Sequence, residues 1–206
     1  MEKKIAQIIS VITHPLLLPT YIYLLLFSKP AFYTLSLTAQ GHKTVILIVF
    51  ITTAITPLSI ILLLFRNKSI KDKLMMEKRQ ERIFPLIVVA MFYYANYYVL
   101  SGLPLHPAFQ VLNIVFSINI VIALIISFFW KISLHTISWG ALVGVLCAFT
   151  VILQTPFLTY ILAGIIVSGI VASARLILKS HQNSEVYLGF LTGFAVSIIS
   201  FILYFF

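Results

Sequence analysis

The sequence predicts an all-α fold, a polytopic transmembrane bundle of six to seven membrane segments, and three observations support this prediction. The chain of 206 residues is 61% hydrophobic and 9% charged, with a mean hydropathy of +1.10. Its apolar runs reach the roughly 20 residues that a helix needs to cross a bilayer. Its charged residues gather between those runs. A soluble protein is excluded, and because no long polar linker is present we expect residues 1–206 to form a single integral membrane domain.

The first apolar run, residues 5–27, follows two lysines and therefore looks like the start of a signal peptide. We expect no cleavage, because the run is too long and no Ala-x-Ala site follows it. His14-Pro15 and Pro19 interrupt its helical hydrogen bonds, so the run is either a kinked span or a re-entrant pair of half helices. We interpret His14 first as a packing residue rather than a ligand.

Six further apolar segments follow. Their expected bounds are 44–65, 83–101, 109–130, 136–153, 157–178 and 186–206. Pro57 should kink the first of them. Two pairs of glycines have the small-xxx-small spacing that lets membrane helices approach closely, namely Gly140 with Gly144 and Gly189 with Gly193. Three polar residues of segment 109–130 are expected to form hydrogen bonds between helices rather than a polar path; they are Asn113, Ser117 and Asn119.

The most charged stretch is residues 66–82, where cations outnumber carboxylates. Its simplest interpretation is a loop that obeys the positive-inside rule. At its membrane end Lys78 and Arg82 lie one helical turn apart and, with Arg79, could point at a headgroup phosphate. The net charge of +9 does not indicate nucleic acid, because the cations flank membrane spans without a polar, aromatic-interleaved scaffold. The lone cysteine, Cys147, excludes an intramolecular disulfide and a cysteine metal site.

Residues 175–185 concentrate charge between two apolar runs. Arg175 would bind an anion, His181 is a titratable nucleophile or base, and Glu185 would hold the imidazole. This combination indicates phosphate chemistry. Taken one at a time, the Arg and His have an ordinary interpretation as interfacial residues. Glu185 would then be a first-turn residue of a helix capped by Asn183 or Ser184.

Counting crossings tests whether such a site can assemble. The charged loop, His135 and His181 are separated from one another by two crossings each, so all three reach one membrane face. Lys29 and Lys43 fall on the opposite face, and the other 12 of the 14 Lys and Arg residues fall on this one. The positive-inside rule therefore predicts that this face is cytoplasmic. We expect the chain to lie in the cell's inner membrane.

With these residues in place, the chain resembles the type-2 phosphatidic acid phosphatase superfamily, whose helical bundle is shared with the vanadium haloperoxidases. The family's third motif, Ser-Arg-x5-His-x3-Asp, is matched by Arg175, His181 and Glu185, with Ala174 at the Ser position. The second motif, Pro-Ser-Gly-His, survives as Ser133 and His135.

The first motif of that family, Lys-x6-Arg-Pro, is degenerate here. Arg82 holds the arginine position, and Met75 stands where the lysine belongs. Lys78 or Arg79 from a neighbouring turn would replace that lysine. The resemblance places a phosphatase-like core at about residues 79–206 and leaves the first two spans outside it.

The resemblance implies a metal-independent, cofactor-free phosphatase that works through a phosphohistidine. His181 would attack phosphorus, Glu185 would orient its ring, and His135 would protonate the leaving alkoxide and then activate water. The phosphate oxygens would be bound by a further set of residues, which are Arg175, Arg82, Arg79 or Lys78, and Ser133.

Several functions remain open from the sequence. A lipid phosphate phosphatase could act on phosphatidic acid, phosphatidylglycerophosphate, an isoprenyl pyrophosphate or a lipid A phosphate. A relative without turnover would bind anionic lipid or transfer phosphate between lipids. A small transporter would instead place charges at mid-membrane in inverted repeats, whereas the charges here lie at span ends. The bilayer and a lipid phosphate are the expected partners, and nucleic acid is not.

Overall fold

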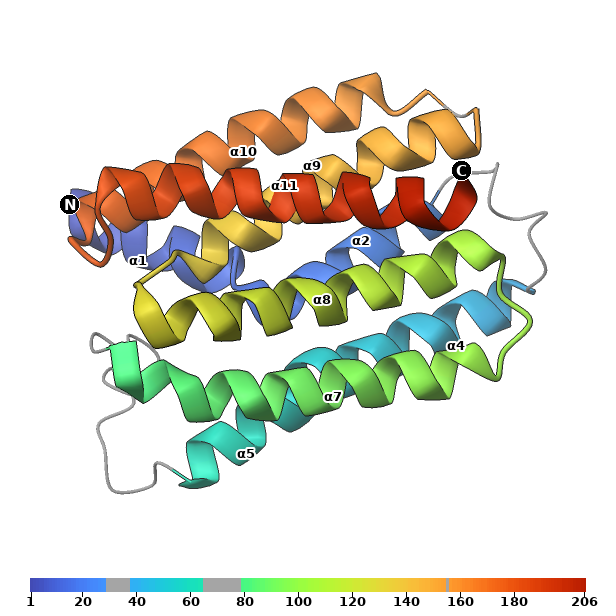
Figure 1. Ribbon diagram of the computed structural model, residues 1–206, viewed down its shortest axis with the longest axis horizontal. Helices are drawn as coiled ribbons and strands as arrows, with labels where there is room; N and C mark the ends of the chain where they lie inside the picture. Colours follow the sequence, from blue (N-terminus) through green and yellow to red (C-terminus); the bar gives the residue numbers. More distant parts are fainter. Residues whose placement is uncertain (29–37, 65–78, 155) are drawn as a thin grey trace. The chain divides into compact units, whose positions relative to one another are not determined.

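Seven long helices make up most of the computed structural model, which describes residues 1–28, 38–64, 79–154 and 156–206 (Figure 1). Each is long and apolar enough to cross a membrane, which confirms the polytopic helical bundle and makes the chain an integral membrane protein. The candidate spans are Glu2–Phe27, Ala39–Leu63, Ile83–Ser101, Pro107–Phe129, Leu134–Ile152, Leu158–Ile177 and Asn183–Phe205. All regular elements in the described ranges are helical.

The helices group into two compact units. Unit 1 combines Met1–Leu18 with Ile132–Phe206, and unit 2 is Pro19–Lys131. Unit 1 contains α1 (Glu2–Ile12), η1 (Pro15–Leu17), α9 (Leu134–Ile152), α10 (Leu158–Ile177) and α11 (Asn183–Phe205). Unit 2 contains α2 (Leu18–Phe27), α4 (Ala39–Phe50), η2 (Ile51–Ile55), α5 (Thr56–Leu64), η3 (Arg79–Arg82), α7 (Ile83–Ser101) and α8 (Pro107–Phe129). The single domain expected from the sequence stays a prediction.

The first span breaks at His14-Pro15, as predicted, whereas Pro19 lies in the first turn of α2, where proline is tolerated, and does not interrupt a helix. α1 ends at Ile12, and a single 3₁₀ turn, η1, precedes α2. Pro15 has no amide hydrogen to continue the α-helical pattern, and the residue before a proline disfavours the α conformation. His14 accordingly has extended backbone angles and caps the 3₁₀ turn, because its Nδ1 accepts from the amide of Leu16 at 3.3 Å. The choice between a kinked and a re-entrant segment stays open.

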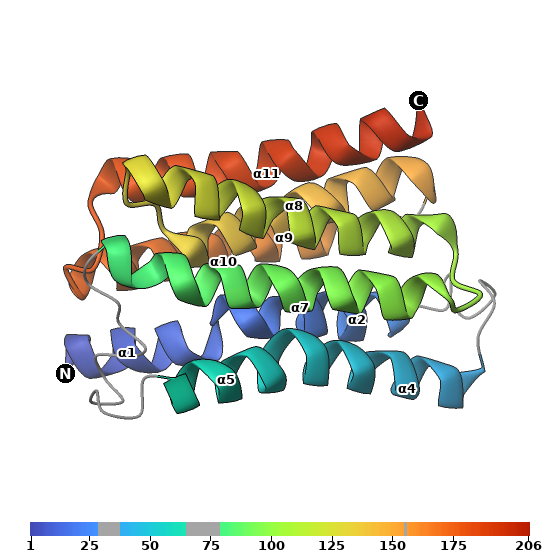
Figure 2. The same cartoon turned by 60° about the horizontal axis from the view of Figure 1, so that its bottom comes forward.

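The glycine pairs bring α9 and α11 into close contact. A Cβ added to Gly140 would overlap the backbone of Phe190, and one added to Gly193 would overlap the backbone oxygen of Ile137. Gly144 and Gly189 also lie against the facing helix, Gly144 against the backbone of Phe194 and Gly189 against the side chain of Thr136. The paired positions advance together along both helices, so α9 and α11 run parallel and begin at the same end of unit 1 (Figures 1 and 2). The predicted close approach is confirmed.

α10 connects these two parallel helices and runs antiparallel to them, as the order of the chain requires. It contacts α9, α11 and α1. Its last turn, with Arg175, therefore lies at the end where α9 and α11 begin (Figure 1). This arrangement gathers at one end of unit 1 the three sequence segments that carry its candidate site residues.

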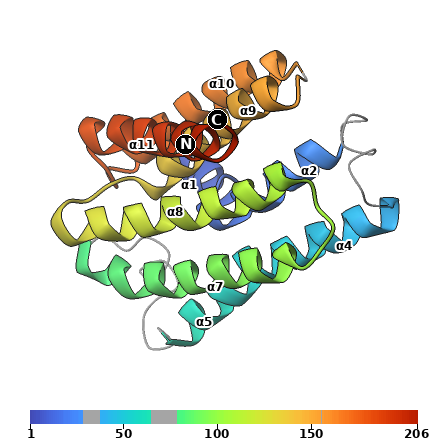
Figure 3. The ribbon, with the colours of Figure 1, turned by 45° about the vertical axis from the view of Figure 1, so that its right-hand side comes forward.

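A buried polar chain joins four helical elements of unit 2, whose α7 and α8 lie side by side (Figure 3). Thr52 donates to the Oδ1 of Asn96 at 2.7 Å, Asn96 Nδ2 donates to the Oδ1 of Asn113 at 2.9 Å, and Asn113 Nδ2 lies 2.8 Å from the hydroxyl of Tyr23. Thr52 lies in a π-helical turn, η2, just before Pro57. The proline expected to kink this span is thus accompanied by a widened turn, since it lacks the amide that would continue the hydrogen bonds.

The prediction of hydrogen bonds between helices holds for one of the three residues of α8. Asn113 bonds to side chains of α2 and α7. Ser117 and Asn119 instead donate to carbonyl oxygens one turn earlier in their own helix, at 3.1 Å and 2.9 Å. For these two residues the local acceptor in the helix replaced the partner expected on a neighbouring helix.

Candidate active site

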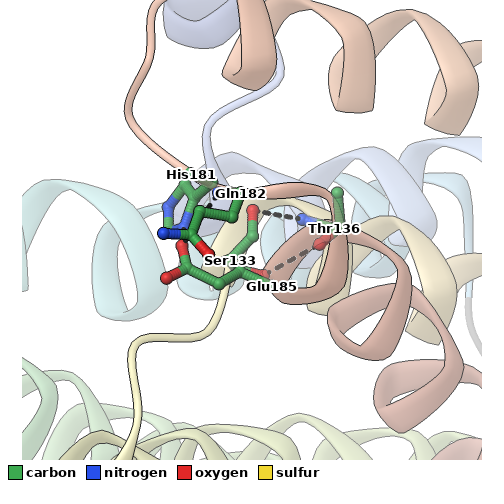
Figure 4. A network of polar contacts seen from close by, with 5 residues as sticks. All are labelled: Ser133, Thr136, His181, Gln182 and Glu185. Carbon is green, nitrogen blue, oxygen red and sulfur yellow. Dashed lines mark hydrogen bonds and ion pairs between the residues drawn. The ribbon is translucent and has the colours of Figure 1, made fainter.

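His181 and Glu185 form a close pair at the start of α11. His181 Nδ1 lies 2.6 Å from Glu185 Oε2, and the two residues are 8% and 7% exposed (Figure 4). An ionised carboxylate can only accept, so Nδ1 donates in this bond. In the neutral ring the lone pair is therefore on Nε2, which is the state of an oriented nucleophile or base.

Glu185 also caps its helix. Its Oε2 accepts from the amide of Gln182 at 3.3 Å, and the Gln182 side chain accepts in return from the backbone at Glu185. This reciprocal pair is a capping box. The predicted first-turn position of Glu185 is confirmed, but the predicted cap at Asn183 or Ser184 is wrong. The helix begins earlier than expected, so Asn183 is already helical and Gln182 takes the extended cap conformation. The capping and histidine-holding roles of Glu185 thus coexist.

Arg175 lies in the last turn of α10 and is 5% exposed. A cation is favoured at a helix C-terminus by the helix dipole. A guanidinium this buried also needs hydrogen-bond acceptors. One of them is Ser10 of α1, whose Oγ lies 3.3 Å from Arg175 Nη1. Arg175 is therefore held from a different helix than the one that carries it.

His135 lies in the first turn of α9 and also reaches α1. Its Nε2 lies 2.9 Å from the carbonyl oxygen of Ser10, which can only accept, so Nε2 donates. Its ring meets the ring of His14 edge-on, with centroids 5.5 Å apart. Arg175, His14 and His181 are all close enough to His135 to interact with it electrostatically. We call Ser10, His14, His135, Arg175, His181 and Glu185 the His181 cluster.

Ser133 is fully buried and caps α9. Its Oγ accepts from the amide of Thr136 at 3.5 Å, and its carbonyl accepts from the Thr136 hydroxyl at 3.1 Å (Figure 4). Its own amide donates to the carbonyl of Glu185 at 3.2 Å, which ties the start of α9 to the start of α11. The sequence expectation that Ser133 donates to phosphate stays a prediction, and its observed contacts are those of a helix cap.

The cations expected from the first motif belong to a different part of the chain. Arg82 closes η3 in unit 2 and is 5% exposed, and Arg79 begins the same short helix. Lys78 lies outside the described residues. Whether any of the three reaches phosphate at the His181 cluster stays a prediction.

Two members of the cluster were not identified from the sequence. We interpreted His14 first as a packing residue, and Ser10 carried no signal of its own. Both come from the first span, which lies outside the family resemblance. The break at His14-Pro15 was visible in the sequence, but nothing local indicated that the end of α1 would meet α9.

The geometry brings together three groups of the kind that phosphoryl transfer uses. One imidazole is oriented by a carboxylate, a second is anchored by a backbone carbonyl, and a buried guanidinium lies within electrostatic reach of the second imidazole. Such positioning and charge stabilisation carry most of the catalysis of phosphoryl transfer.

Comparisons of the chain with protein-family models, with curated proteins and with solved structures give no match.

Proposed function

We propose that this protein is a metal-independent phosphatase that hydrolyses a lipid phosphate or pyrophosphate at the membrane surface. The observation that carries the proposal is the buried His181–Glu185 pair at the end of a membrane span, with Arg175 and His135 in the same cluster. A buried ionisable cluster in so apolar a chain needs a function to account for it. The resemblance to the type-2 phosphatidic acid phosphatases names that function.

The first step forms a phosphohistidine. His181 Nε2 attacks phosphorus while its Nδ1 proton stays in the hydrogen bond to Glu185, whose charge stabilises the developing imidazolium. The phosphorus–oxygen bond to the lipid breaks, and the leaving oxygen takes a proton from His135. Because Nε2 of His135 donates to the Ser10 carbonyl, the transferred proton comes from Nδ1, so His135 enters this step as the imidazolium, a form that the charge of the bound phosphate favours. Arg175 neutralises charge on the phosphoryl oxygens.

The second step restores the enzyme. Water attacks the phosphohistidine, and His135 Nδ1, now unprotonated, takes a proton from that water. The phosphorus–nitrogen bond breaks, inorganic phosphate leaves, and the lone pair returns to His181 Nε2. Both imidazoles and all protons are then where they began, so one water is consumed for each phosphate released.

The substrate is a lipid because the cluster lies at the ends of apolar spans. The acyl or prenyl chain would remain among the helices while its headgroup reaches His181. If each of the seven candidate spans crosses once, His135 and His181 lie on one side, and the positive-inside rule, applied to the charges in the sequence, favours a cytoplasmic location for that side.

Sidedness can be tested with one matched pair of cysteines in a Cys147→Ala background. Lys179 and Gly102 are both exposed and lie outside the spans. An odd number of spans separates them, so they are expected on opposite sides of the membrane. An impermeant thiol reagent added to intact cells should label Gly102→Cys and spare Lys179→Cys. The reverse labelling pattern would place the site on the outer face.

The experiment that tests the proposal is phosphate release by purified protein in detergent with excess chelator, over a panel of lipid phosphates and pyrophosphates. Wild type should release phosphate, and His181→Ala and His135→Ala should not. The matched control is His106→Asn, which removes a histidine outside the cluster while asparagine can still cap α8. Silence of well-folded wild type over the whole panel would favour a relative that binds anionic lipid without turnover.

A further inference from the structure

Ser10 contacts two members of the His181 cluster through two different atoms. Its hydroxyl oxygen accepts from Arg175 Nη1 at 3.3 Å, and its carbonyl oxygen accepts from His135 Nε2 at 2.9 Å. Ser10 itself is 8% exposed. One residue of α1 therefore holds the guanidinium at the end of α10 and the imidazole at the start of α9.

The carbonyl of Ser10 is available because the helix ends just after it. In a continuing α-helix it would accept from the amide of His14. That amide instead donates to Val11 at 3.3 Å, in a tightened last turn. His135 takes the place left at Ser10, and Trp139, one turn further along α9, donates to the carbonyl of Thr13 at 3.3 Å. The break before Pro15 thus creates the acceptors that dock α1 on α9.

The hydroxyl of Ser10 is also used in an unusual way for a helical serine. Six serines in the described helices donate to the carbonyl four residues earlier in their own helix; these are Ser117, Ser127, Ser138, Ser168, Ser173 and Ser197. The Oγ of Ser10 instead accepts from Arg175, which is 165 positions away in the chain. Together with Ala6, one turn before it, Ser10 forms the buried face of α1, and α1 packs against α10.

We propose that Ser10 is a positioning residue of the phosphate site, and that the first span is therefore part of that site. The hydroxyl holds Arg175, which binds the phosphoryl oxygens. The backbone carbonyl keeps one proton of His135 on Nε2, so that Nδ1 is the nitrogen that gives and takes the transferred proton. This inference rests on the proposed function. It extends the site beyond the residues that the family resemblance supplies, all of which come from later in the chain.

The size of the effect follows from the type of bond. The bond involves a charged group, but the Ser10–Arg175 distance of 3.3 Å is long. We therefore expect its removal to weaken phosphate binding by about tenfold, which corresponds to about 1.4 kcal/mol. The loss should appear in KM and in phosphate affinity, because Arg175 contacts substrate in the ground state as well as in the transition state.

The test uses two pairs of variants of the full-length protein. Ser10→Thr keeps the hydroxyl, and Ser10→Val has nearly the same shape as Ser10→Thr but lacks the hydroxyl. Ser10→Ala is compared in the wild-type and Arg175→Gln backgrounds. For each we would measure the melting temperature, the affinity for inorganic phosphate by ³¹P line broadening, and kcat and KM for the lipid phosphate that wild type hydrolyses.

We expect Ser10→Val and Ser10→Ala to bind inorganic phosphate about tenfold more weakly and to raise KM by a similar factor. Ser10→Thr should stay within about threefold of wild type, and Ser10→Ala should cause no further loss in the Arg175→Gln background. If Ser10 acted only through packing, the variants would differ in melting temperature and active fraction, but Ser10→Thr and Ser10→Val would have similar phosphate affinity and KM.

Two results would overturn the inference in distinguishable ways. If wild type binds and releases phosphate but Ser10→Val matches Ser10→Thr, Ser10 does not position Arg175 and the proposed function stands. If folded wild type binds no phosphate at all, the proposed function fails and the role of Ser10 fails with it.

Discussion

Replacing Glu185 by Gln isolates the role of its charge at His181. The two side chains have nearly the same shape, so the packing at the start of α11 is kept. Glu185 Oε2 accepts from His181 Nδ1 at 2.6 Å and from the Gln182 amide at 3.3 Å. The amide oxygen of glutamine can replace one of these acceptor roles, but its NH₂ group can also donate to Nδ1 and so favour the wrong tautomer.

The magnitude follows from the geometry of this pair. The shorter bond is charge-assisted and buried, and such bonds contribute about 1.5–3 kcal/mol. If Glu185→Gln removes this stabilisation from the transition state for attack by His181, the rate of phosphoenzyme formation falls by about tenfold to about 150-fold. The capping bond is separate and contributes about 1 kcal/mol to stability.

Rapid-quench measurement of phosphoenzyme formation, with the melting temperature of each variant, separates these two roles. The matched control is Gln182→Ala, which removes the side-chain half of the capping box and leaves the His181–Glu185 pair intact. We expect Gln182→Ala to lower the melting temperature and to keep the phosphoenzyme rate within about threefold of wild type. Equal rates in Glu185→Gln and wild type, or equal rate losses in the two variants, would refute the orienting role.

Three further predictions concern stability in detergent. Gly193→Ala should destabilise unit 1 by at least about 1–3 kcal/mol, because the added Cβ overlaps the backbone of α9, whereas Gly169→Ala, which meets no atom within 4 Å, should stabilise by about 0.5–1 kcal/mol; similar melting temperatures would contradict the packing. Asn113→Ala should cost about 2–4 kcal/mol, since it leaves buried groups of Asn96 and Tyr23 without their partner, and a urea or thermal melt within about 0.5 kcal/mol of wild type would contradict this. Partial burial lowers the pKa of His106 below its ordinary value of 6.5 in the folded protein, so the unfolded chain binds more protons there. The contribution of His106 to stability is therefore complete above pH 6.5 and is lost as the pH falls below 6.5. The melting temperature of wild type should fall more than that of His106→Asn between about pH 7 and 5, and parallel curves for the two proteins would contradict this prediction.

The parts of this structure that depend on local spacing could be predicted from the sequence. Apolar runs set the seven spans, Pro15 set the break in the first, and the glycine pairs set the contact between α9 and α11. The four-residue spacing of His181 and Glu185 also indicated that they would pair. His181 lies before the cap residue Gln182, so the pair forms across the start of α11 rather than on one face of a helix turn.

The parts that depend on long-range packing could not be predicted. Ser10 meets His135 and Arg175 across 125 and 165 positions of the chain, and a serine in an apolar helix normally bonds to its own helix. Likewise Asn96 and Tyr23 gave no sign that they would meet Asn113. For Ser117 and Asn119 the sequence showed polar side chains but did not show that Ser117 Oγ and Asn119 Nδ2 would donate to carbonyl oxygens of the same helix.

The most direct test of the account is to trap the phosphohistidine. Purified protein would be quenched in alkali a few milliseconds after mixing with a ³²P-labelled lipid phosphate that it hydrolyses, with excess chelator present. A phosphohistidine on His181 predicts an alkali-stable, acid-labile label on wild type and no label on His181→Ala. His135→Ala should carry more label than wild type if this change slows hydrolysis of the phosphoenzyme more than its formation. Phosphate release by wild type without any label, or a label that persists in His181→Ala, would contradict the account.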